Sequence, residues 1–371
     1  MSVDLGAVFA TGRGQAERFA GPVQVGIPIG TFQRQTFADG RFVDLDDFDA
    51  CFFQIQYFVV QGQCDLFAHG RTWDVIADER PLQAAEGCRV LLAGATGYLG
   101  SFVLHELQRR NYSTRVIVRN PSRMQSVSPN VDVRLGEVTQ ADTLKGVCED
   151  IDVVISTVGI TRQKDGMTYM DVDFQANANL IDEAKRSGVK RFIYVSVFNG
   201  ENMRHLKICE AKERLGDYLK NSGLDYCIVR PTGFFSDMRD FLKMAKGGSV
   251  WLFGDGMLRM NPIHGADLAR AVVDTLHSHQ HELNIGGPDV LTHNQIAELA
   301  LRAYGHQPRV RHLPDFVRRS TLFLLRLFTP AKTYGPLEFF LTAMAMNMQA
   351  PTYGEEKLED FFKREVESEK T

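Results

Sequence analysis

From Arg89 onward, short apolar runs alternate with helical segments, and no other feature of the chain constrains its fold as strongly. Such alternation is typical of β-α-β units, in which helices cover both faces of a parallel sheet. We expect strands at 89–93, 114–118, 131–135, 152–157, 191–197 and 225–229, with helices at 98–110, 170–187 and 205–221. The pattern therefore predicts an α/β fold with a doubly wound parallel sheet.

The flanks of this region predict three domains. Residues 1–88 lack the alternation and form an N-terminal extension of unknown fold, with one strand expected at 52–60 and a hairpin turn at Asp39-Gly40. Residues 89–248 carry the alternation. The alternation becomes less regular over 249–371, which forms a smaller C-terminal region. There we expect strands at 250–253 and 283–285 and a helix that begins with a capping box at Thr292.

A glycine-rich loop joins the first expected strand to the first helix. It follows the pattern G-x-x-G-x-x-G, with Gly94, Gly97 and Gly100 enclosing Thr96, Tyr98 and Leu99. Glycines allow a tight turn and the close approach of a pyrophosphate, whose charge the helix N-terminus stabilises. The loop predicts a Rossmann-like domain that binds a dinucleotide through these residues, although such a fold can also lose its ligand.

The end of the second strand indicates which dinucleotide binds. An acidic residue about 20 positions after the loop would bind the ribose 2′-hydroxyl of NAD. This chain has Arg119 there, with Arg123 nearby, and guanidinium groups can bind the 2′-phosphate of NADP. We therefore expect NADP(H) as cofactor; the alternative is two solvated surface arginines.

Several motifs together resemble an atypical short-chain dehydrogenase/reductase. They are the glycine loop, Tyr194-Val195-Ser196, Ala211-Lys212, Arg230-Pro231-Thr232-Gly233-Phe234-Phe235, and C-terminal motifs such as Ile285-Gly286-Gly287-Pro288 and Pro351-Thr352-Tyr353-Gly354. The likeness covers about 89–366. It is most similar to the branch that contains divinyl chlorophyllide a 8-vinyl reductase, with NmrA-like proteins as further relatives.

This resemblance implies that Thr157, Pro231 and Phe234 line the cofactor. It also implies catalytic positions at Ser196, Asp173 and Lys212, with Lys212 holding the nicotinamide ribose. Many members of the superfamily place a proton-donating tyrosine four residues before that lysine, but here the position is Ile208. The roles of Ser196 and Asp173 stay open, since Asp173 could also lie on a helix surface and Lys212 could be an exposed helix lysine.

The missing tyrosine favours some reactions over others. Reduction of a ketone places charge on one oxygen and needs an acid nearby. Reduction of a C=C bond conjugated to a large π system spreads that charge. The sequence therefore predicts a reductase of a conjugated, hydrophobic small molecule, with a tetrapyrrole vinyl group suggested by the resemblance. The alternatives are an NADPH-binding sensor or assembly subunit, as in NmrA-like regulators and the 39-kDa-like subunit of respiratory complex I, and, less favoured, an epimerase or dehydratase.

Composition narrows the partners and the location. The 371 residues carry 42 basic and 46 acidic side chains, and this mildly acidic balance argues against a nucleic-acid partner. We expect six reduced thiols, a cytoplasmic protein (or a plastid one in a photosynthetic source), and no membrane span. No metal is expected, because His277, His279 and His281 lack companion ligands. The oligomeric state stays open.

Two C-terminal segments leave alternatives open. The stretch 316–328 is amphipathic and basic, which suits an ordinary helix or contact with a membrane surface. The stretch 337–348 is rich in Phe and Met, which suits core packing or closure over a flat apolar substrate.

Overall fold

The structure is a computed structural model of the whole chain. It describes residues 87–124, 130–160, 166–328 and 331–370, and also the short strands 8–11, 15–18, 54–60 and 63–69. Within the longer ranges, the side chains of 123, 325 and 331–334 are not described. The chain divides into two compact units, Met1–Arg80 and Pro81–Thr371.

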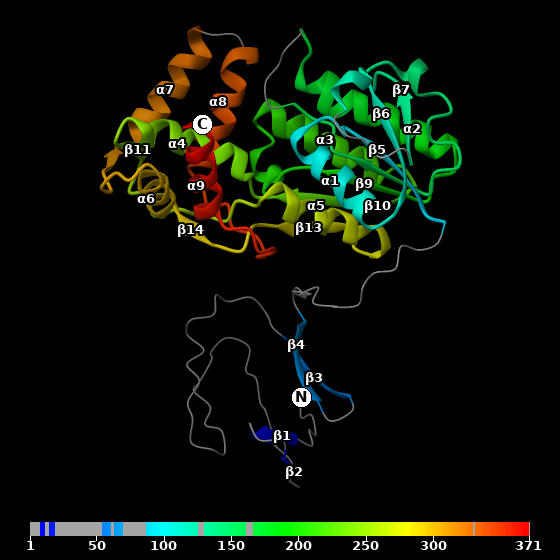
Figure 1. Cartoon of the computed structure of the whole chain (residues 1–371), viewed down its shortest axis with the longest axis horizontal. Helices are drawn as coiled ribbons and strands as arrows, with labels where there is room; N and C mark the ends of the chain where they lie inside the picture. Colours follow the sequence, from blue (N-terminus) through cyan, green and yellow to red (C-terminus); the bar gives the residue numbers. More distant parts are fainter. Residues whose placement is uncertain are drawn as a thin grey trace. The chain divides into compact units, whose positions relative to one another are not determined.

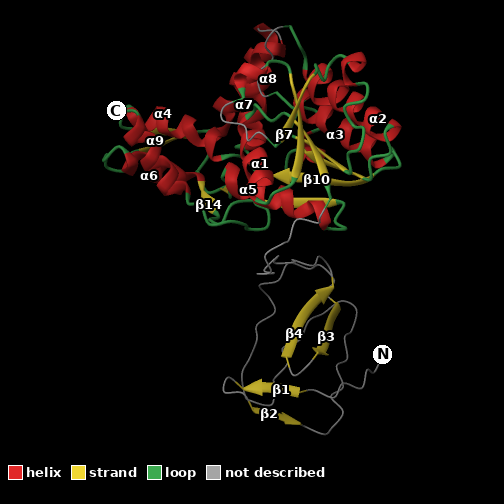
Figure 2. Ribbon diagram, turned by 45° about the vertical axis from the view of Figure 1, so that its right-hand side comes forward, coloured by secondary structure: helices red, strands yellow, loops and turns green. Residues whose placement is uncertain are grey.

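The second unit is built on a seven-stranded sheet in which every neighbouring pair is parallel (Figure 2). The strand order is β13-β10-β9-β8-β5-β6-β7. In chain order the strands are β5 (Arg89–Ala93), β6 (Ser113–Val118), β7 (Val131–Leu135), β8 (Val153–Ser156), β9 (Arg191–Val195), β10 (Asp225–Pro231) and β13 (Glu282–Ile285). The predicted doubly wound, Rossmann-like sheet is confirmed, and its order reverses between β5 and β8, where ligands bind in such folds.

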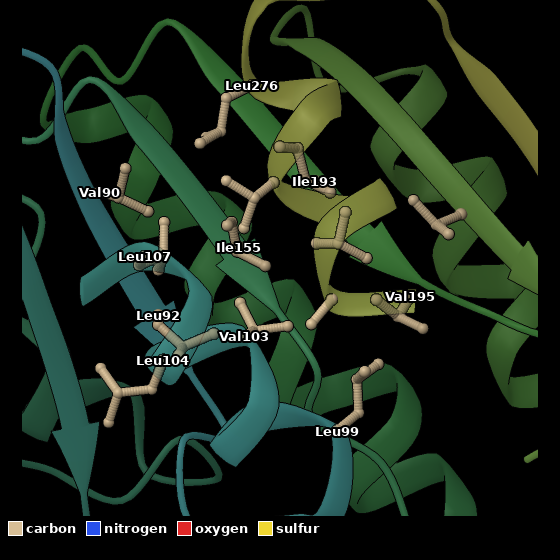
Figure 3. Packing of buried hydrophobic residues seen from close by; sticks show 14 of the residues in the cluster. Val90, Leu92, Leu99, Val103, Leu104, Leu107, Ile155, Ile193, Val195 and Leu276 are labelled. Carbon is tan, nitrogen blue, oxygen red and sulfur yellow. The ribbon is translucent and has the colours of Figure 1, made fainter. Parts of the chain in front are cut away.

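Helices cover both faces of this sheet because successive strand residues point to opposite sides. On one face, Val90 and Leu92 of β5 pack under α1 (Tyr98–Arg109) and α5 (Gly265–Asp274). Figure 3 shows this cluster from close by. On the other face, Leu91 and Ala93 pack under α2 (Asn177–Arg186) and α3 (Lys207–Lys220). The unbroken apolar runs of the sequence thus correspond to strands that are buried on both sides.

Two elements differ in detail from expectation. The helix expected at 170–187 begins as a π-helix, Met170–Ala176, and continues as α2. The strand expected at 283–285 in the C-terminal region is β13, which pairs with β10 and forms the edge of the main sheet. Helix α5, also from the C-terminal region, packs on α1. The first part of the C-terminal region therefore contributes to the sheet and its cover.

The rest of the C-terminal region packs around a second core. Helices α4 (Arg239–Lys246), α6 (His293–Ala303) and α9 (Leu358–Ser368) enclose buried Phe235, Phe241 and Phe362 (Figure 1). The other strands and α-helices are β11 (Val250–Phe253), β12 (Arg259–Met260), β14 (Leu291–Thr292), β15 (Val310–Leu313), α7 (Asp315–Phe328) and α8 (Ala331–Ala343). The capping box at the start of α6 is confirmed, since Thr292 and Gln295 exchange side-chain-to-backbone hydrogen bonds.

The described residues of the first unit form two antiparallel strand pairs. β1 (Val8–Thr11) pairs with β2 (Gln15–Arg18), and β3 (Gln54–Val60) pairs with β4 (Gln63–His69). The strand expected at 52–60 overlaps β3, whereas the turn expected at Asp39-Gly40 lies outside the described residues.

Candidate active site

The glycine loop is as tight as its sequence predicts. Gly94 has a φ of +91°, a conformation that side chains disfavour. A Cβ on Gly100 would lie 2.0 Å from the carbonyl oxygen of Gly94, and a Cβ on Gly94 would lie 2.5 Å from Oγ1 of Thr157. Two of the three glycines are thus required by close packing of the loop against helix α1 and strand β8.

The third glycine lies where a ligand could approach. Gly97 is the N-terminal cap of α1 and has no side chain to accept the first helical N–H groups, and both it and Thr96 are exposed. Unsatisfied N–H groups at a helix N-terminus form an anion site. The side chain of Leu99 is buried in the core, so only its backbone can face a ligand. The loop thus fits a dinucleotide pyrophosphate.

Beside the loop, Arg119 follows strand β6. Its side chain is largely exposed, and its Nε lies 3.6 Å from a carboxylate oxygen of Glu137, which follows β7. The guanidinium is therefore free to turn toward a ligand phosphate. Arg123 lies in the short turn 121–123, but its side chain is outside the described residues.

A buried ion pair lies behind the end of β8. Lys212 Nζ of α3 is 2.9 Å from Oδ1 of Asp173, whose side chain is inaccessible to solvent, and the lysine side chain is only 14 % exposed. A Cβ added to exposed Gly159 would come within 2.7 Å of Asp173 Oδ1 and 3.1 Å of Lys212 Nζ. Both surface alternatives are thus wrong: Asp173 is no helix-surface residue and Lys212 no exposed lysine.

The π-helix positions Asp173. Within this segment, Asn177 Nδ2 donates to the carbonyls of Val172 and Asp173 at 3.2 and 3.0 Å. The backbone N–H of Ile160 donates to Asp173 Oδ2 at 3.2 Å. π-Helical turns are frequent at functional sites, but the sequence pattern from 170 to 187 carried no sign of this one.

Charge at the pair favours a permanent cation. Burial acts to lower the pKa of Lys212, but Asp173 together with other neighbouring groups raises it, so the pKa lies above its ordinary value. Burial raises the pKa of Asp173, and the Lys212 ammonium opposes that rise. Lys212 therefore offers positive charge and hydrogen-bond donation, and it is a poor general base.

The hydroxyl groups near the pair are buried. Ile208 is also buried, and the tyrosine of α3, Tyr218, is exposed and donates to Asp182 instead. Tyr194 of β9 lies with its ring centroid 5.8 Å from Lys212 Nζ, and burial raises its pKa to about 12. Tyr194 Oη and Ser196 Oγ are both buried and adjoin one another. The sequence suggested Ser196 but missed Tyr194, although the strand period of two places them on one face.

The loop after β10 closes the other side of the site. Pro231 ends β10, and the half-buried ring of Phe234 packs edge-on against Tyr98 with centroids 5.6 Å apart. Phe235, the last residue of the same motif, is buried against His264 and Phe361. Phe339 and Met344 likewise pack on the second core, which favours core packing over closure for that segment.

The remaining candidates carry structural contacts. His277 hydrogen-bonds Tyr112 at 2.8 Å and His281 lies 3.6 Å from Asp225. No metal-binding group of His, Cys, Asp or Glu occurs among the described residues. Cys148, Cys209 and Cys227 are free and buried, and Cys88 is half-buried. In the described part of the chain no helix is both long and apolar enough to cross a bilayer.

Comparisons with known proteins agree with this geometry. The sequence model described as NAD(P)H-binding matches residues 94–279, half of the chain. The chain is 28 % identical over 315 residues to divinyl chlorophyllide a 8-vinyl-reductase, chloroplastic, of Cucumis sativus, covering 74 % of this chain and 75 % of that protein. It is 25 % identical to the photosystem II assembly factor Ycf39 of Guillardia theta, covering 61 % and 73 %.

A solved structure supports the fold. The NADPH complex of an NADPH-dependent quinone oxidoreductase from Escherichia coli superposes with a TM-score of 0.61 at 18 % identity, covering 76 % of this chain and all of that one. The resemblance to Rossmann-like dehydrogenase/reductase proteins drawn from the sequence is confirmed. The chain belongs to the NAD(P)H-binding family.

Proposed function

We propose that the chain is an NADPH-dependent reductase of a conjugated, hydrophobic small molecule. The observation that carries this proposal is the buried Asp173–Lys212 pair, 2.9 Å apart, under exposed Gly159 at the carboxyl-terminal edge of the sheet. A lysine kept charged at that edge can bind the cofactor and can also stabilise negative charge that develops on a reacting substrate.

Different residues of the chain would bind different parts of the cofactor. The N–H groups at the start of α1, among them that of Tyr98, would bind the pyrophosphate, and Arg119 and Arg123 would bind the 2′-phosphate. Thr157, Pro231 and Phe234 would border the nicotinamide end, where Lys212 would donate to the ribose. NADPH, when bound, supplies a hydride and its electron pair.

The arrangement of polar groups favours a conjugated acceptor. The Tyr194 and Ser196 hydroxyls are buried, and the usual tyrosine position is Ile208, so no side-chain acid among these residues reaches an exposed oxygen. Hydride addition to an extended π system spreads negative charge, which the fixed Lys212 cation can stabilise while water supplies the proton. The relatives named divinyl chlorophyllide a 8-vinyl-reductase suggest the 8-vinyl group of a tetrapyrrole, and their chloroplastic names suggest a plastid in a photosynthetic source.

Turnover tests this proposal. We expect the full chain with NADPH to reduce divinyl chlorophyllide a, measured as the mono-vinyl product by chromatography. Lys212→Met should lower kcat about 100-fold, the cost of losing a donor to developing charge. Lys207→Met, an exposed lysine on the same helix, is the matched control and should keep full activity.

A second candidate is a non-catalytic NADPH-binding assembly subunit. The buried hydroxyls and Ile208 favour it, as does the likeness to a protein named as an assembly factor. Tight NADPH binding without turnover of the tetrapyrrole or of simpler conjugated enones would support this candidate and contradict the reductase.

A further inference from the structure

Helix α7 turns its apolar side away from the protein. Phe316, Phe323, Leu324, Leu327 and Phe328 each expose half or more of their surface, up to 75 % for Phe328. Two adjacent pairs, 323–324 and 327–328, are four residues apart, and Phe316 lies seven residues before Phe323, which places all five on one side of the helix. Leu322, by contrast, is buried. An ordinary surface helix would show the reverse arrangement, with its apolar stripe facing the core.

A further large apolar side chain is exposed on a strand that contacts α7. Trp251 of β11 is also exposed, and β11 pairs with β15, the strand directly before α7. The guanidinium of Arg311 lies 5.0 Å from the Trp251 ring centroid. Tryptophan and arginine together at the border of an apolar surface are typical of the region between lipid headgroups and acyl chains.

Charge around this face is opposite to that of the whole protein. Residues 309–328 contain five arginines and one acidic residue, Asp315, whereas the whole chain has a formal charge of −4. Arg319 and Arg326 are two turns apart and border the apolar face, pairing with Asp315 and Glu338. Arg309 and Arg311 have no ion pair with a described acidic residue. The local excess of positive charge attracts an anionic surface.

We propose that α7, with Trp251 at its border, lies in the surface of an anionic lipid bilayer, its axis parallel to the membrane. Fourteen residues are too few to span the hydrocarbon core, but they suit a helix lying in the interface. A second copy of the chain is a poorer occupant, since a two-fold contact over this face would bring the arginine borders together. Figure 1 shows α7 paired with α8 beside the C-terminal helices.

Flotation with lipid vesicles tests this assignment. The full chain should float with vesicles of phosphatidylcholine containing about one third phosphatidylglycerol, and less with phosphatidylcholine alone. A variant combining Phe316→Ser, Phe323→Ser and Leu327→Ser should bind at least about 10-fold more weakly, because three large apolar side chains no longer enter the bilayer. An Arg311→Gln variant should bind anionic vesicles more weakly and lose part of the salt dependence.

A matched pair of leucines provides the control. Leu327 on α7 and Leu135 on β7 are 63 % and 67 % exposed. Leu327→Ser should weaken vesicle binding, whereas Leu135→Ser should leave it unchanged, with thermal unfolding confirming that both variants fold. Failure of the wild-type chain to float, or equal effects of the two leucine variants, would overturn the proposal. So would a dimer that the triple variant dissociates, measured by sedimentation velocity without lipid.

Discussion

Arg119 is the residue on which the proposed choice of cofactor depends. Its guanidinium is largely exposed and only loosely paired with Glu137, at 3.6 Å. Arg119→Ala should lower NADPH affinity about 10- to 100-fold, the loss of one charged hydrogen bond, and leave NADH affinity unchanged. Titration calorimetry with both cofactors measures this. As the control, Arg134→Ala removes an exposed arginine from nearby β7 and should change neither the NADPH nor the NADH affinity. If Arg119→Ala keeps the wild-type preference for NADPH over NADH, Arg119 does not bind the 2′-phosphate.

Lys212 and Asp173 show how far residue-level reasoning reaches. The sequence named both, because the resemblance to a known family implies functional residues at these two positions. It could not tell a buried pair from two surface side chains, since 39 positions separate them and a turn of π-helix sets the orientation of Asp173. The contact exists only because α3 and the segment after β8 pack on the same face of the sheet.

At the scale of elements, two glycines between β5 and α1 serve different purposes, one for packing and one for binding the cofactor. Gly100→Ala should destabilise the fold by about 3 kcal/mol or more, because its Cβ would lie 2.0 Å from a backbone oxygen. Gly97 has an ordinary φ of −83°, and a Cβ there would lie 3.2 Å from the Gly94 oxygen. Gly97→Ala should therefore change stability by only about 1 kcal/mol yet lower cofactor affinity about 10-fold. Denaturant unfolding and cofactor titration separate the effects; equal stability losses would refute this division.

The start of α6 predicts a pH effect on stability. His293, the first residue of the helix, is buried, and burial lowers its pKa to about 4. In the unfolded chain histidine binds its proton near pH 6.5. Between these values the unfolded state holds more protons, so stability rises with pH.

From pH 7 to pH 5 the wild type should therefore lose about 2 kcal/mol more unfolding free energy than His293→Gln. Urea unfolding at both pH values provides the comparison. The same loss in the two proteins would show that His293 does not contribute.

At the scale of the whole molecule, Asn261 joins segments that are distant in sequence. Its fully buried side chain donates to the carbonyls of Gly287 and Ala350 and accepts from the N–H of Ala350. Asn261→Ala would leave these groups unsatisfied and should destabilise the protein by about 3 kcal/mol. Asn221→Ala removes an exposed side chain that bonds within α3 alone and should cost less than about 1 kcal/mol. Thermal unfolding of the two variants compares them.

The local signals of the sequence predicted most of the sheet, the glycine loop and the cap of α6. Each depends on residues within one strand, turn or helix, where apolar periodicity and backbone geometry act directly. The Rossmann-like order follows from the same signals, because connections between parallel strands are short and right-handed.

Contacts over long sequence distances were beyond such signals. Three features depend on which elements pack together. They are the burial of the Asp173–Lys212 pair, the place of β13 in the main sheet, and the hydrogen bonds by which Asn261 joins distant segments. The amphipathic pattern of α7 was visible in the sequence. Periodicity identifies an apolar face and a polar face of a helix, but it does not determine which of them packs against the protein. That choice depends on the surfaces that neighbouring elements leave free, and here it left the apolar face exposed.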